Sequence, residues 1–117
     1  MTIKKLLALI SLVAVMAASA AFAQPPSDMT LSWNGAESAL SVSAAHQVND
    51  RTKHFIMTMI VKDGDGKQLL MKRYTEQPTD AGFSDKVTLN GVKPGTKLTV
   101  ELTCNIMGSL AKDITIN

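Results

Sequence analysis

The chain has 117 residues, of which 45% are hydrophobic and 4% aromatic, and its formal net charge is +2. This length is enough for one small domain. Because Lys4 and Lys5 supply the excess of basic residues, residues 24–117 carry equal numbers of acidic and basic side chains. A neutral domain lacks the basic face that contacts to phosphates require, so the composition argues against a nucleic-acid-binding protein.

Residues 1–23 have the pattern of an export signal. Lys4 and Lys5 precede an apolar run over residues 6–18, and Ala21-Phe22-Ala23 has the small-x-small pattern of a signal-peptidase site. The apolar run is shorter than the ~20 residues that a membrane-spanning helix needs. We therefore expect a signal peptide that is cleaved after Ala23, and a mature protein that is periplasmic or secreted and not attached to a membrane.

The rest of the chain is expected to form a flexible leader, residues 24–28, and one domain, residues 29–117. Most of this domain alternates apolar and polar residues with the period of two that is typical of β-strands. The alternating or apolar segments are residues 29–33, 40–44, 55–61, 68–74, 87–89, 98–102 and 114–116. About seven short strands separated by turns predict an all-β fold, an immunoglobulin-like β-sandwich.

Specific turns and strands can be placed within this pattern. Residues 55–61 are almost continuously apolar, which predicts a buried central strand. Asp63-Gly64-Asp65-Gly66 predicts the turn of a β-hairpin between this strand and residues 68–74; it lacks the spaced oxygen ligands of a calcium loop. A polar loop is expected around Pro78 and Gly82. Residues 87–89 and 98–102 are expected to form a further pair of strands across a turn at residues 90–95.

Four side chains with sulfur or imidazole nitrogen donors lie in two short segments of the chain. His46 and His54 flank the polar loop of residues 47–53, while Cys104 ends a predicted strand and Met107 follows three residues later. A single cysteine in an oxidising compartment can be a small buried hydrophobe, half of an intermolecular disulfide or a metal ligand. Because two histidines, a cysteine and a methionine are typical transition-metal ligands, the set predicts a metal site.

The segment Cys104-Asn105-Ile106-Met107-Gly108 resembles the Cys-Asn-Ile/Leu-His-Gly signature of desulfoferrodoxin and neelaredoxin, the superoxide reductases. The segment His46…His54-Phe55-Ile56 is similar to the His-Pro-Met…His-Tyr-Ile segment of the same family, although its loop is longer and lacks Pro-Met. The turn at residues 63–66 lies where the family has an acidic or Asn-Gly turn. The resemblance covers residues 40–111.

This resemblance implies an immunoglobulin-like domain with a ferrous iron (Fe2+) centre. The family's iron has four equatorial imidazoles, one axial cysteine thiolate and a sixth position open to superoxide. The resemblance implies that His46 and His54 are equatorial ligands and that Cys104 is the axial ligand, with Met107 in the place of a third histidine. Because the chain has only two histidines, it cannot complete the family's iron centre as a single chain.

Three interpretations of the function remain open. The first is a desulfoferrodoxin-like iron-binding protein, an oxidoreductase that acts on superoxide or with a small redox partner protein, with the family's full activity not expected. The second is a copper-binding carrier or electron-transfer protein that uses His46, His54, Cys104 and Met107, a donor set similar to that of blue-copper centres. The third is a metal-free interaction module.

Overall fold

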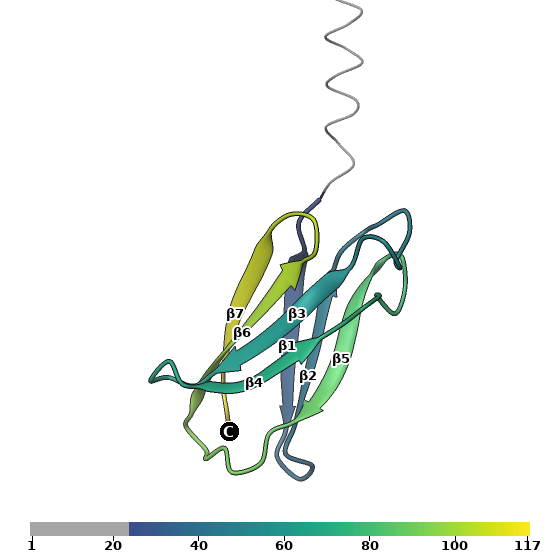
Figure 1. The fold of residues 1–117 in the computed structure, drawn as a ribbon. Coiled ribbons are helices and arrows are strands. Elements are labelled where there is room, and N and C mark those ends of the chain that lie inside the picture. The colour runs from purple at the N-terminus through teal and green to yellow at the C-terminus, as the bar shows by residue number, and fades with distance from the viewer. Residues whose placement is uncertain (1–23) are drawn as a thin grey trace, which may run out of the picture.

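The computed structural model describes residues 24–117, which form two antiparallel β-sheets packed face to face (Figure 1). The predicted signal peptide, residues 1–23, lies outside the described residues. The strands are β1 (Ser27–Asn34), β2 (Ala39–Ala45), β3 (Ile56–Lys62), β4 (Gln68–Arg73), β5 (Gly82–Thr88), β6 (Lys97–Cys104) and β7 (Ser109–Thr115). One sheet has the order β1-β2-β5 and the other has the order β4-β3-β6-β7.

The expected all-β, immunoglobulin-like sandwich of seven strands is confirmed. In the constant-type immunoglobulin domain the fourth strand belongs to the sheet of the first two strands. Here β4 instead pairs with β3, so the four-stranded sheet is the one that contains β3 and β6. This pairing follows from the tight turn after β3, which leaves β4 no length in which to cross to the other sheet.

The turn between β3 and β4 is the hairpin that the sequence predicts. The carboxylate of Asp63 accepts hydrogen bonds from the backbone nitrogens of Asp65 and Lys67, both at 2.9 Å. Gly66 has a φ of 84°, a left-handed conformation that glycine adopts without steric cost. Every one of these interactions spans at most four residues, which is why the local sequence was sufficient to predict the turn.

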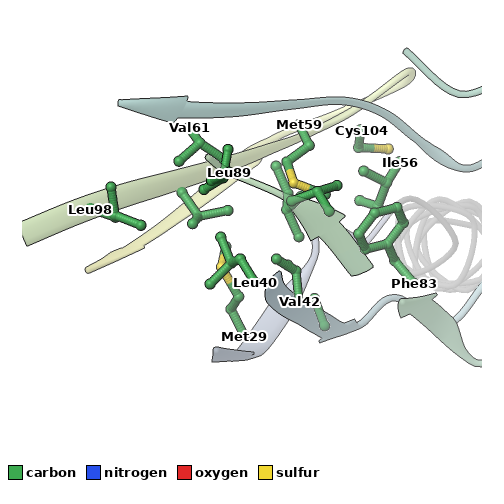
Figure 2. Close-up of a cluster of buried hydrophobic side chains, with 14 of the residues drawn as sticks. Met29, Leu40, Val42, Ile56, Met59, Val61, Phe83, Leu89, Leu98 and Cys104 are labelled. Carbon is green, nitrogen blue, oxygen red and sulfur yellow. The ribbon is translucent and has the colours of Figure 1, made fainter. Parts of the chain in front are cut away.

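The core lies between the two sheets, and β3 supplies part of it (Figure 2). The pairing of β3 with β6 is irregular between Ile56 and Thr58. As a result Ile56, Met59 and Val61 are all buried in the core, whereas Ile60 faces the other side of the sheet and is half-buried. Cys104 lies at one end of the core cluster, and Leu98 lies toward the opposite end (Figure 2).

Two expectations about β5 are wrong. Gly82, expected in a polar loop, is the first residue of β5 and pairs with Ala45. Residues 87–89 do not pair with residues 98–102, because β5 pairs with β2 whereas β6 pairs with β3 and β7. The connection at residues 89–96 therefore crosses between the sheets and is not a hairpin turn. A Cβ atom at Gly82 would lie 2.6 Å from the carbonyl oxygen of Ala44, so a side chain here would force the two strands apart.

The terminal strands are longer than the apolar pattern indicates. β1 begins at Ser27, where residues 24–28 were expected to be a leader, and β7 begins at Ser109, well before the expected segment of residues 114–116. β7 is an edge strand with mostly exposed side chains, so alternation is weak in its sequence. In the described part of the chain, no helix is long and apolar enough to cross a membrane.

Candidate metal centre

His46, His54 and Cys104 come together at one end of the sandwich, each at or near the end of a different strand. His46 follows the last residue of β2, His54 precedes β3 by two residues, and Cys104 is the last residue of β6. The register pairs Ile56 with Cys104, which fixes His54 beside the end of β6. Because β2 belongs to one sheet and β3 and β6 to the other, the cluster lies between the two sheets.

The cluster has the dimensions of a metal site. One potential ligand atom from each residue lies within 4.8 Å of the other two, and all three residues are buried. His54 Nε2 is 3.2 Å from Cys104 Sγ. The two imidazole rings meet edge to face, with centroids 4.7 Å apart and planes at 88°. Nitrogen and sulfur ligands bind metal ions at ~2.0–2.3 Å, so the donors would move toward a shared ion on binding.

His46 has one satisfied and one unsatisfied ring nitrogen. Nδ1 forms a short hydrogen bond with Gln77 Oε1. Nε2 is buried and has no hydrogen-bond partner among the described residues, and the residue as a whole is only 1% exposed. A buried polar atom without a partner costs about 1–3 kcal/mol. A metal ion bound to Nε2 would remove this cost.

Electrostatics keep the second imidazole in the form that binds metals. Burial, and then the neighbouring His46, lower the pKa of His54 below its ordinary value of 6.5. Both effects disfavour the imidazolium ion, because a positive charge here would be poorly solvated and would lie near a second imidazole. His54 is therefore neutral at neutral pH, and one of its ring nitrogens carries the lone pair that metal coordination requires.

Asn105 holds the cysteine loop against the segment that carries His54. Its side-chain oxygen accepts a hydrogen bond from Phe55 N at 2.9 Å, and its amide nitrogen donates to Lys53 O at 3.0 Å. Its backbone nitrogen donates to Phe55 O at 3.0 Å. The two side-chain bonds explain why an asparagine directly after Cys104 suits this site, because its amide accepts from one side of the His54 segment and donates to the other.

The backbone after the cysteine also faces its sulfur atom. Ile106 N lies 3.4 Å from Cys104 Sγ and donates a hydrogen bond to it. Cys104 N donates to Gly108 O at 3.0 Å, which closes the loop, and Gly108 has a φ of 84°. Met107, a candidate ligand from the sequence, is 51% exposed at the tip of this loop, and Ile106 is 58% exposed.

Gln77 is the residue of this region that the sequence did not single out. It lies between β4 and β5, is fully buried, and contacts His46 through its side chain. A glutamine before a proline is ordinarily a solvated loop residue, and nothing in the local pattern distinguishes it. Its contacts reach residues 21 and 31 positions away, so only the tertiary structure could identify it.

The buried group of His46, His54 and Cys104 can therefore bind a metal ion, and among residues 24–117 it is the one cluster of at least three such side chains with this geometry. Two imidazoles and a thiolate form a compact donor set without a carboxylate, which favours transition metals over calcium or magnesium. Comparison of the chain with protein-family models, with curated proteins and with solved structures gives no match.

Proposed function

We propose that this protein binds one transition-metal ion through His46, His54 and Cys104. The observation that carries the proposal is that His46, which clusters with a thiol and a second imidazole, has a buried Nε2 with no hydrogen-bond partner among the described residues. A purely structural histidine ordinarily satisfies both ring nitrogens when it is buried. The lowered pKa of His54 adds support, because it reduces the competition between protons and a metal ion for the ring nitrogen.

Copper is the metal that the donor set favours. Thiolate sulfur and imidazole nitrogen both suit copper, and a trigonal set of two histidines and one cysteine is typical of blue-copper electron-transfer sites. Within the described residues no further histidine, cysteine, aspartate or glutamate joins the cluster, whereas ferrous iron usually takes more ligands. Bound copper would supply one-electron chemistry or a cargo ion, so we propose a copper carrier or electron-transfer protein.

Iron is the second candidate, and the sequence resemblance to superoxide reductases supports it. The residues that carry the resemblance also lie together: Asn105 of the cysteine segment bonds to Lys53 and Phe55 on either side of His54. In this interpretation the protein reacts with superoxide or exchanges electrons with a small redox protein. Rapid superoxide reduction is not expected, since two of the four equatorial imidazoles have no counterpart in the chain.

The proposed compartment is the periplasm, reached by means of the signal sequence in residues 1–23. Intact-mass measurement of the protein from a periplasmic extract tests this: we expect a species that begins at Gln24. A species that retains Met1 would contradict it.

Metal titration tests the proposed function. The metal-free protein is titrated under anaerobic conditions with Cu(I), and separately with Fe(II), and the bound metal is measured by elemental emission. We expect one equivalent of copper to bind more tightly than iron, and Cys104→Ser to abolish that binding. Met71→Leu is the matched control, because Met71 is an exposed thioether on β4, away from the cluster. If the wild type retains neither metal, the proposed function is refuted and the metal-free interaction module is the interpretation that remains.

A further inference from the structure

Gln77 is fully buried, and its side-chain amide makes four contacts. Nε2 donates to His46 O at 3.1 Å and to Thr79 O at 3.2 Å. Oε1 accepts a hydrogen bond from Ile56 N at 3.1 Å and also contacts His46 Nδ1. The amide thus connects the end of β2, the start of β3 and its own connection between β4 and β5.

These contacts determine which ring nitrogen of His46 carries the proton. Both partners of Gln77 Nε2 are carbonyl oxygens, and one partner of Oε1 is a backbone N–H. If the nitrogen and oxygen of the amide exchanged places, two acceptors or two donors would face each other at each of these three contacts. Oε1 can only accept, and His46 Nδ1 must therefore be the donor. A neutral imidazole has one N–H, which leaves Nε2 with a free lone pair. Nε2 is the atom that has no hydrogen-bond partner.

We propose that Gln77 is a positioning residue that fixes the tautomer and ring orientation of His46, so that Nε2 is presented to the metal. This inference rests on the proposed function, because it names the residue that prepares one ligand of the same site. A histidine that binds a metal generally donates its other N–H to a neighbouring acceptor. In this chain that acceptor is a neutral amide, held in place by three backbone groups.

The segment around Gln77 is itself attached to the loop that separates the two histidines. Gln77 N donates to Arg51 O at 3.0 Å, and Arg51 Nη1 donates to Gln77 O at 2.7 Å. Further along, Val48 N donates to Asp80 O at 2.8 Å, and His46 N donates to Ala81 O at 3.1 Å. The connection between β4 and β5 holds none of the three proposed ligands, yet it lies alongside the histidine loop and sets its shape.

The decisive measurement is the protonation of the His46 ring in the metal-free protein. Long-range proton–nitrogen correlation NMR on protein with 15N-labelled histidine distinguishes a protonated ring nitrogen from an unprotonated one. In the wild type we expect the proton on Nδ1. Gln77→Met removes the acceptor and should release the proton to Nε2 or to a mixture of both forms. Gln77→Glu keeps an acceptor oxygen while it loses the amide donors, so it should retain the Nδ1 proton even though it is less stable.

Arg51→Met is the matched control for a purely structural effect. It removes the 2.7 Å hydrogen bond to Gln77 O and the ion pair with Glu76, but it leaves the His46 ring and the Gln77 amide in place. We expect this variant to keep the wild-type tautomer and metal affinity, whereas Gln77→Met should weaken Cu(I) binding by roughly 10–100-fold.

Two results would overturn the inference: a wild-type His46 with its proton on Nε2, or a folded Gln77→Met variant with an unchanged tautomer. If Gln77→Met does not fold, the wild-type, Gln77→Glu and Arg51→Met spectra decide. The tautomer is measured without metal, so the two proposals fail separately. If the wild type binds neither copper nor iron, the proposed function is refuted. The role of Gln77 toward His46 is then decided by the spectra alone.

Discussion

The two ends of the sandwich differ in what they bury. The end that carries His46, His54 and Cys104 also contains Gln77, and together these histidines and Gln77 are all the buried polar residues of residues 24–117. The opposite end, where β3 leads into β4 and β5 leads to β6, has an open cavity of about 330 Å³. Leu69, Leu70, Leu89 and Val92 are the apolar residues that line it.

The hydrogen bonds at the two ends differ in the same way. Asp63 satisfies backbone nitrogens that are at most four residues away, and it lies on the surface of the turn. Gln77 satisfies groups 21 and 31 residues away in the interior. Local polar bonds are sufficient to form a turn, but burying imidazoles and an amide is costly and needs a compensating interaction. A metal ion bound at the His46 end, as proposed above, would supply such an interaction there.

The largest expected effect is the loss of metal binding when the His46 end is changed. Added Cu(I) or Fe(II) should slow alkylation of Cys104, because a coordinated thiolate is not free to react. His46→Ala or His54→Ala should remove this protection and weaken metal binding by more than about 100-fold, since losing a ligand costs more than losing a residue that only hydrogen-bonds to a ligand. The rate of alkylation with and without metal is the measurement. Equal protection in the variants would contradict the comparison.

Truncating a core side chain at either end should lower the unfolding free energy by a similar amount, but only truncation at the His46 end should weaken metal binding. Ile56→Ala and Leu98→Ala each remove a fully buried side chain and should cost about 2–5 kcal/mol of unfolding free energy. Ile56 pairs with Cys104, so its truncation should also weaken metal binding, whereas Leu98→Ala should not. Urea unfolding and copper titration of the same samples check both points. Similar metal affinities in the two variants would show that the core does not support the site.

Between the two ends, Tyr74 and Lys72 connect β4 to β5 through Asp85. Tyr74 Oη donates to Asp85 Oδ2 at 2.6 Å, and Lys72 Nζ lies 2.7 Å from the same oxygen. Partial burial would raise the pKa of Asp85, but these two bonds and one from Lys86 N outweigh it and lower the pKa below 3.8. Burial, and then Asp85, raise the pKa of Tyr74, which therefore remains a donor.

Tyr74→Phe should consequently have a pH-dependent effect. Because the folded-state pKa of Asp85 is lowered, the stabilisation is fully present above the unfolded-state pKa of about 4 and is lost as the pH falls through the folded-state value. We expect the variant to lose about 1–3 kcal/mol at neutral pH and less in acid. Urea unfolding at neutral pH and near pH 2.5 measures this, and a difference that grows in acid would be the wrong sign.

The smallest expected effect is at the opposite end. Asp63→Ala removes two exposed backbone-to-carboxylate hydrogen bonds and should cost about 1 kcal/mol without changing metal affinity. Asp65→Ala is the control, because the Asp65 side chain accepts neither of these bonds. A change in metal affinity in Asp63→Ala would show that the two ends are coupled.

The fold was largely predictable because its signals are local. Alternation with a period of two identified the strands, and the Asp-Gly turn identified the hairpin. Alternation cannot assign strands to sheets, so the pairing of residues 87–89 with 98–102 that it predicts is wrong: the pairing depends on where the connection at residues 89–96 crosses. β7 was largely missed because an exposed edge strand needs little apolar alternation.

The sequence by itself determined the types of the candidate donors and their places in the chain, with His46 and His54 on either side of one loop and Cys104 at the end of a strand. Only the tertiary structure decided that the three are close together and buried between the sheets, that Met107 is exposed, and that Gln77 contacts His46. The physical reason is sequence separation. Cys104 meets His54 across 50 residues and Gln77 meets His46 across 31, distances that only the packing of the two sheets closes.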